Sequence, residues 1–271
     1  MIKFDMGKAW RDAVAMISAN REVMLVVSGV FFFLPGFAAA LLMPDMQPPV
    51  GASPEQTEQV LLDFYSRNAP IFVVMALIQT VGLIALIALL RDDRKPTVGE
   101  ALKIGGVGLL PYIGTQLLIA AGLVLLVAVL VGVPIGLGVG VIGGILGVLC
   151  VPLVIYVLVK FSLVTPVIAI EKVMSPIAAL QRSWALTKGN SVLLFAFYLL
   201  LMVVFFVIAI VIGLVFGVLF ALLGTGTAYM IVNGIFSGVL GAAATMIFSA
   251  VLAAVHHQLA ESVSGISRTF E

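Results

Sequence analysis

The chain contains six long apolar runs, and none of them includes Asp, Glu, Lys or Arg. A helix needs about 20 predominantly apolar residues to cross a bilayer. The first run starts after Glu22 and is too long for the core of a cleavable signal peptide. The sequence therefore predicts an all-α polytopic membrane protein, a single integral membrane domain over residues 1–271. Its predicted spans are 23–42, 71–90, 109–131, 139–159, 192–216 and 231–255.

The composition agrees with this reading, because 62% of the residues are hydrophobic and only 10% are charged. Soluble domains carry about 25% charged residues. A soluble enzyme, a disulfide-rich secreted domain and a disordered chain are excluded on this ground. The formal net charge of +1 gives no reason to expect a nucleic-acid partner, and the single cysteine, Cys150, cannot form an intrachain disulfide.

The distribution of Lys and Arg predicts the orientation of the chain. In a six-span threading thirteen of the 14 Lys and Arg residues fall on one side, and only Arg67 falls on the other. Because positive charge is retained in the cytoplasm, both termini are expected there. The residues on the predicted cytoplasmic side are Lys3, Lys8, Arg11, Arg21, Arg91, Arg94, Lys95, Lys103, Lys160, Lys172, Arg182, Lys188 and Arg268.

The end of the fourth span is ambiguous, since Lys160 is the only charge between residues 132 and 170. A lysine inside the bilayer is costly unless it snorkels or is paired. We expect the span to end near Lys160 and to continue as a cytoplasmic or interfacial extension, 161–170, broken at Pro166. Pro152 is expected to kink the helix.

Three amphipathic segments precede the odd-numbered spans and predict interfacial helices. The first, 5–19, places Met6, Trp10, Ala13, Val14 and Ile17 on one face. Such helices could sense lipid or bind a partner, although anchoring of the spans is the simpler explanation.

The other two amphipathic segments carry start and stop signals. Thr97 and Glu100 form a capping-box pattern. Ser175 and Pro176 suit the start of the third helix, and Gly189 suits its end. With Ala9, Ala101 and Ala179 at similar places, the chain resembles three units of interfacial helix plus hairpin.

Glycines recur every four residues in the last three spans, a spacing that lets membrane helices approach closely. We predict that they pack these spans against one another or against a second copy of the chain. The glycines concerned are Gly136, Gly140, Gly144, Gly213, Gly217, Gly234 and Gly238.

The spans supply no convergent titratable groups, so no catalytic residue, cofactor or metal ligand is assigned. Their polar side chains, among them Gln79, Gln116 and Asn233, fit hydrogen bonding between helices better than a polar path. His256 and His257 are adjacent and point to different helix faces. His257 and Glu261 have the i, i+4 spacing of a ligand pair, but an interfacial polar patch is the commoner meaning.

An inner vestibule is the remaining candidate site. Glu171 and Lys172, with Arg182 and Lys188 nearby, could form an ion-paired vestibule, although a solvated charged loop is the favoured interpretation. The candidate vestibule and interface residues are Trp10, Lys160, Glu171, Arg182 and Trp184.

Two segments carry a resemblance to a known family: FSLVTPVIAIE at 161–171 and SPIAALQRSWALTKG at 175–189. They resemble the bacterial family described as glycerophosphoryl diester phosphodiesterase membrane-domain-like, related to the YciC inner-membrane proteins. The resemblance implies a multi-pass protein of the bacterial inner membrane. In bifunctional members the phosphodiesterase chemistry belongs to a separate soluble domain, so no catalytic residue is implied here.

Two functions remain open at this point. The first is a non-enzymatic membrane module that binds lipid or a partner protein, or self-associates. The alternative is a small-molecule carrier or export component, which would gain support if Gln79, Gln116 and Asn233 line one cavity. A third class, an intramembrane lipid enzyme, would need a nucleophile and a base at one depth, and the sequence offers only a pairing of His256 or His257 with interfacial carboxylates.

Overall fold

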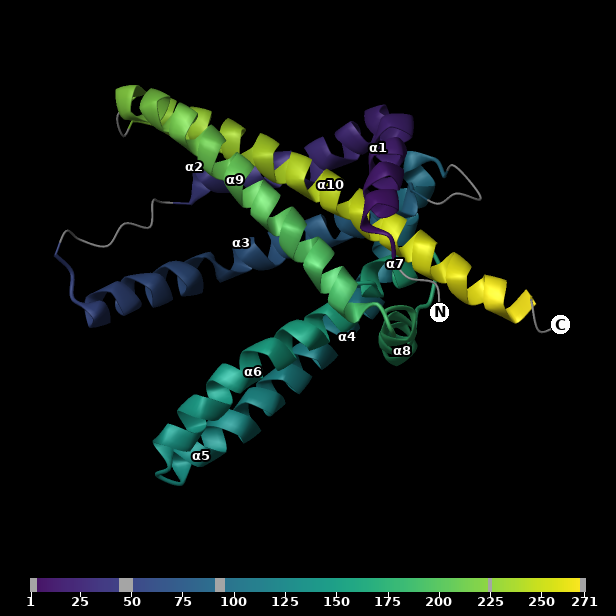
Figure 1. Cartoon of the computed structure of the whole chain (residues 1–271). Helices are drawn as coiled ribbons and strands as arrows, with labels where there is room; N and C mark the ends of the chain where they lie inside the picture. The colour runs from purple at the N-terminus through teal and green to yellow at the C-terminus, as the bar shows by residue number, and fades with distance from the viewer. Residues whose placement is uncertain (1–3, 44–50, 91–95, 224–225, 269–271) are drawn as a thin grey trace.

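The computed structural model describes residues 4–43, 51–90, 96–223 and 226–268, and every regular element in these ranges is helical (Figure 1). The predicted all-α class is therefore confirmed. The helices are α1 (Met6–Ser28), the π-helical turn η1 (Gly29–Phe33), α2 (Leu34–Leu42), α3 (Pro54–Ala88), α4 (Val98–Val127), the π-helical turn η2 (Ala128–Gly132), α5 (Val133–Gly136), α6 (Gly140–Lys160), α7 (Val164–Ala169), α8 (Pro176–Leu186), α9 (Ser191–Leu223) and α10 (Thr227–Arg268).

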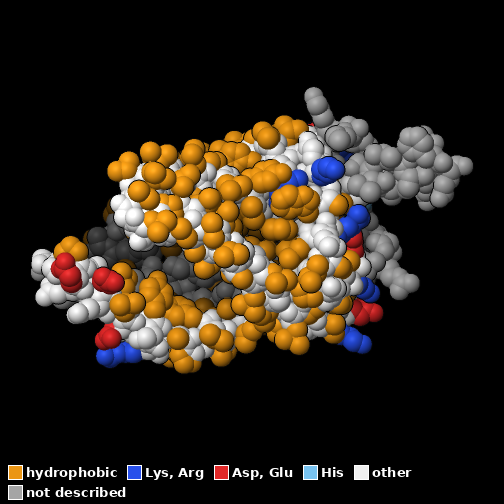
Figure 2. Space-filling model, turned by 90° about the horizontal axis from the view of Figure 1, so that it is seen from below, with side chains coloured by type: hydrophobic (Ala, Val, Ile, Leu, Met, Phe, Trp, Pro, Cys, Tyr) orange, Lys and Arg blue, Asp and Glu red, His pale blue; other side chains and the backbone are white. Residues whose placement is uncertain are grey.

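Six helical segments in the described part of the chain are long and apolar enough to cross a membrane, in agreement with the predicted number. The helices extend beyond the apolar runs. For example, α3 starts at Pro54, well before the predicted boundary at residue 71. Figure 2 shows hydrophobic side chains over most of the visible face, with Lys, Arg, Asp and Glu at its two ends.

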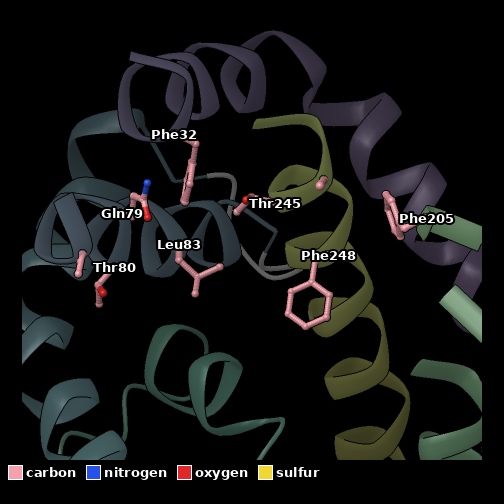
Figure 3. Close-up of a pocket in the computed structure, with 9 residues that line it drawn as sticks. Phe32, Gln79, Thr80, Leu83, Phe205, Thr245 and Phe248 are labelled. Atoms are coloured by element: carbon pink, nitrogen blue, oxygen red, sulfur yellow. The ribbon is translucent and has the colours of Figure 1, made fainter. Parts of the chain in front are cut away.

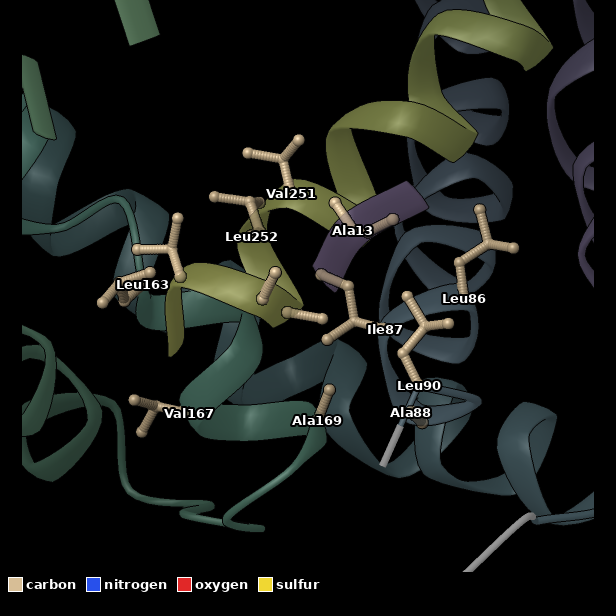
Figure 4. Packing of buried hydrophobic residues seen from close by; sticks show 14 of the residues in the cluster. Ala13, Leu86, Ile87, Ala88, Leu90, Leu163, Val167, Ala169, Val251 and Leu252 are labelled. Carbon is tan, nitrogen blue, oxygen red and sulfur yellow. The ribbon is translucent and has the colours of Figure 1, made fainter. Parts of the chain in front are cut away.

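The long helices spread apart at one end and meet at the other (Figure 1). At the meeting point α7 lies against α3, α4, α8 and α10. We call this buried cluster the hub and define it by residues 84–90 of α3 and its end, 163–169 around α7 and 250–255 of α10. Figure 4 shows how apolar side chains from these segments and from α1 pack together there.

The hub also joins the three amphipathic segments. Ala9, Ala101 and Ala179 are each 0% exposed, so the positions that look alike in sequence are all buried. Small side chains at these points let the helices approach closely. Only α8 is a separate helix, however. The first segment continues into its span in α1, with a kink at Asn20, and the second continues directly into α4.

The expected extension of the fourth span differs from what is found. As predicted, α6 ends at Lys160, but the break lies at residues 161–163 and not at Pro166. Pro166 lies in the first turn of α7, where its missing N–H costs nothing. Residues 163–169 are buried among other helices in the hub, which the sequence did not indicate.

The local start and stop signals are largely as expected. Thr97 and Glu100 form the predicted capping box, and Gly189 has the positive φ of a helix stop, 84°. Ser175 precedes α8 in an extended conformation, but its side chain makes no capping hydrogen bond. In α1, Ala9 and Ala13 face the hub, whereas Trp10 and Val14 are exposed. The buried face of α1 is therefore rotated about the helix axis relative to the predicted apolar face.

The glycines with repeat spacing fall into two groups. A Cβ on Gly234 would lie 3.0 Å from Phe37, and one on Gly238 would lie 2.8 Å from Phe33, so these two glycines allow α10 to approach η1 and α2. The remaining five would meet no described atom within 4 Å, and they make no close packing contact within this chain. This group comprises Gly136, Gly140, Gly144, Gly213 and Gly217.

Candidate functional site

A charged cluster of three residues lies at the edge of the hub. The Arg182 guanidinium donates to both carboxylate oxygens of Glu171, at 2.8 Å and 3.0–3.1 Å. The Nε2 atom of His256 lies 2.9 Å from Oε1 of the same carboxylate. We call this arrangement the Glu171 clamp. It joins three parts of the chain: the segment after α7, the middle of α8 and the second half of α10.

The clamp is largely shielded from solvent, with the Glu171 side chain only 22% exposed and His256 almost fully buried. Burial alone would raise the pKa of Glu171. Hydrogen bonds from His256 and Arg182, together with their charges, outweigh burial and lower the pKa of Glu171 to about 2. The vestibule ion pair therefore exists as a fixed contact, and the solvated-loop interpretation is wrong for Glu171 and Arg182.

The two adjacent histidines have different partners, as expected for neighbours on a helix. His256 faces Glu171, whereas Nε2 of His257 lies 3.6 Å from Glu261 at a more exposed position. In the described ranges, no three His, Cys, Asp or Glu side chains meet as a metal site would require. The clamp itself is an ion-paired joint in which His256 lies beside the Glu171 carboxylate.

Lys172 follows the clamp directly and has a positive φ of 58°. This left-handed conformation costs a non-glycine residue about 1–2 kcal/mol. The preceding residue, Glu171, is held by both Arg182 and His256, so this conformation lies directly next to the clamp.

Lys172 lines a pocket of about 310 Å³ together with Lys103 and Glu100 from the first turns of α4. Its other walls are apolar and include Ile104, Val107 and Met174. We call it the Lys103–Lys172 pocket. It combines two cations and one anion with a hydrophobic wall, at the end of the molecule where α4 begins.

Lys160 is only 2% exposed, although it is the last residue of α6. Its Nζ lies 5.1 Å from the centre of the Trp184 ring and 5.6 Å from that of Tyr156. Cation–π contact and the negative end of the α6 dipole both favour the ammonium group there. The backbone carbonyl of Lys160 also accepts a 2.8 Å hydrogen bond from Ser183, which ties α8 to α6.

A second cavity, of about 530 Å³, lies between η1, α3, α9 and α10 (Figure 3). Gln79, Thr80 and Thr245 give it a polar side, and Phe205 and Phe248 are among its apolar walls. The Thr245 hydroxyl donates to Gly241 O at 2.9 Å.

A carrier was expected to have Gln79, Gln116 and Asn233 around one cavity. Only Gln79 lines this one. Gln116 and Asn233 do not belong to its lining, so the three do not converge.

The structure thus brings together Glu171 with Arg182 and Lys160 with Trp184. Trp10 lies apart on α1 and is 42% exposed. Tyr156 was not expected at this site, although it precedes Lys160 by four residues on α6, a spacing that places both on one face of the helix. His256 was expected only beside an unspecified interfacial carboxylate, and the structure shows that this carboxylate is Glu171.

Comparisons with known proteins add no relative. A scan against protein-family models, a search of the curated proteins and a search of the solved structures each find no match to this chain.

Proposed function

We propose that the protein is a non-enzymatic, lipid-binding module of a bacterial inner membrane, with both termini in the cytoplasm. The observation that carries the proposal is the Lys103–Lys172 pocket, which places ammonium groups beside an apolar wall at the Lys- and Arg-rich end of the spans. A phospholipid has the matching arrangement of a phosphate next to acyl chains. Membership of the phosphodiesterase membrane-domain-like family remains part of this proposal and rests on residues 161–171 and 175–189.

The separation of the spans supports lipid binding. One span, Val98–Gly136, consists of α4, η2 and α5, and another, Ser191–Val218, lies in α9. In the most apolar 18-residue window of each of these spans, no residue is buried inside the chain. Lipid must therefore solvate most of these surfaces. Lipids that enter between the spans have direct access to the pocket at the base of α4.

The proposal is tested by native mass spectrometry of the purified chain after mild detergent exchange. We expect wild-type protein to retain phospholipid, and a variant with both Lys103→Ala and Lys172→Ala to retain less. Arg67→Ala is the control, because Arg67 pairs with Asp63 on an exposed turn of α3 far from the hub. Wild-type protein that carries no lipid would contradict the proposal.

A small-molecule carrier is the second candidate, favoured by the Gln79, Thr80 and Thr245 cavity. Gln79 makes no hydrogen bond to the described residues, so a polar solute could satisfy its amide. Transport assays in vesicles with Gln79→Leu distinguish this function, because a carrier would lose flux while the lipid-binding module would keep its bound lipid.

A further inference from the structure

We propose that the Lys103–Lys172 pocket selects phospholipids whose headgroup is monoanionic and carries hydroxyl donors, as in a glycerol phosphodiester. The inference rests on the proposed lipid-binding function and adds the class of headgroup.

The charge of the pocket favours a single negative charge. At neutral pH the side chains of Lys103 and Lys172 contribute two positive charges and Glu100 contributes one negative charge. The described residues that line the pocket therefore carry a net charge of +1, which one phosphodiester neutralises. A zwitterionic lipid would leave the pocket charged beside the low-dielectric membrane.

Glu100 adds a preference for hydrogen-bond donors. One carboxylate oxygen, Oε2, accepts from the backbone N–H of Thr97 at 2.9 Å in the capping box. A carboxylate has two oxygens and about four acceptor sites, so Glu100 retains acceptor capacity toward the pocket. Glycerol hydroxyls can donate to it, whereas a choline group has no N–H or O–H to donate.

An exposed apolar face leads from the pocket along α4. Val107 lines the pocket and is 55% exposed, and it is followed on the same side of the helix by Leu110 at 78% and Leu117 at 65%. Ten residues of helix rise about 15 Å, which is half of a bilayer core. Acyl chains attached to a headgroup in the pocket can lie along this face.

The Glu171 clamp positions the backbone of one pocket cation. Lys172 has φ 58° and follows a carboxylate that both Arg182 and His256 hold. The Lys172 side chain itself is exposed, so the clamp acts on the backbone from which the side chain extends to line the pocket. Glu171 is therefore a positioning residue for lipid binding.

The experiment uses the full chain in nanodiscs that contain equal amounts of phosphatidylglycerol, phosphatidylethanolamine and phosphatidylcholine. The protein is released from the nanodiscs, and the lipids that remain bound to it are counted by native mass spectrometry. We expect phosphatidylglycerol to be enriched about fivefold over phosphatidylcholine for each lysine beside the headgroup, since attraction of one lysine to a headgroup of net negative charge contributes about 1 kcal/mol and the choline charge cancels that attraction. Lys103→Gln and Lys172→Gln should each reduce the enrichment about fivefold, and Lys103→Arg should preserve it.

Two further variants separate selectivity from folding. Glu100→Gln keeps the helix cap, because Gln56 makes the same capping box before α3. The variant raises the pocket charge to +2, so the preference for phosphatidylglycerol over phosphatidylethanolamine should increase. Lys8→Gln on α1 is the matched control and should change nothing.

The outcomes are distinguishable. Bound lipid with equal retention of all three headgroups would overturn this inference and leave the proposed function intact. No bound lipid from any nanodisc would overturn the proposed function itself. Displacement of the bound lipid by excess glycerol phosphate in detergent would show that the pocket recognises a soluble phosphate ester, which also overturns the inference.

Discussion

Replacement of Glu171 by Gln should destabilise the fold at neutral pH. Most of this destabilisation should disappear in acid, where Glu171 of the wild-type protein also loses its charge. The substitution keeps the size of the side chain and removes the charge that Arg182 and His256 share. Because the clamp joins α8 and α10 to the segment after α7, its loss weakens the contacts that close the hub.

The magnitude follows from the pKa of Glu171, which is lowered from 4.5 to about 2. A shift of this size corresponds to about 3 kcal/mol of stabilisation. The side chain is only 22% exposed, so solvent screens this contribution weakly. Since the folded-state pKa is lowered, the stabilisation is complete above about pH 4.5 and is lost as the pH falls through about 2. At about pH 3 less than half of it remains.

The assay is thermal unfolding of wild-type and Glu171→Gln protein in detergent between pH 7 and pH 3. A difference of about 3 kcal/mol at pH 7 should shrink steadily below pH 4.5. Glu261→Gln is the matched control, because Glu261 also faces a histidine but is more exposed, and such pairs contribute about 0–1 kcal/mol. An equal effect of the two substitutions, or a difference that does not change with pH, would refute the role of the clamp.

Two other predictions concern packing and orientation. A Cβ on Gly105 would lie 2.5 Å from the Val81 carbonyl oxygen, whereas one on Gly106 would meet nothing within 4 Å. Gly105→Ala should therefore destabilise by about 1–3 kcal/mol, and Gly106→Ala should be neutral or gain up to about 1 kcal/mol from helix propensity; equal unfolding temperatures would contradict this. The predicted orientation can be tested with a membrane-impermeant maleimide and single cysteines in a Cys150→Ser background. Glu58→Cys should be labelled in intact cells, and Gln181→Cys should be labelled only after lysis. The reverse pattern would show that the orientation is inverted.

The spans could be predicted from the sequence because the bilayer imposes a single requirement on each of them separately. An apolar run without charges becomes a helix whatever its neighbours are, since every backbone N–H and C=O must be satisfied within the segment. The end of α6 at Lys160 and the capping box of α4 follow from equally local causes. These features need no knowledge of which helices meet.

The contacts between helices could not be predicted in this way. Glu171 and His256 are 85 residues apart, and no periodicity relates them. The short helix α7 resembles an interfacial extension in composition, yet it forms the centre of the hub because α3, α4, α8 and α10 surround it. Repeat spacing alone also fails for the glycines: Gly238 packs against Phe33, whereas Gly140 has no neighbour to approach.

The clamp and the pocket depend on each other through the chain itself. Lys172 directly follows Glu171, which Arg182 of α8 and His256 of α10 both contact. A movement of α10 away from the hub would break the His256 contact and loosen the backbone that positions Lys172. Binding of a phosphate by Lys172 would oppose that movement, because a ligand stabilises the state that binds it more tightly. Lipid retention and the thermal stability of the α10 contacts should therefore decrease together in Glu171→Gln, whereas Lys103→Gln should reduce lipid retention without loosening the clamp.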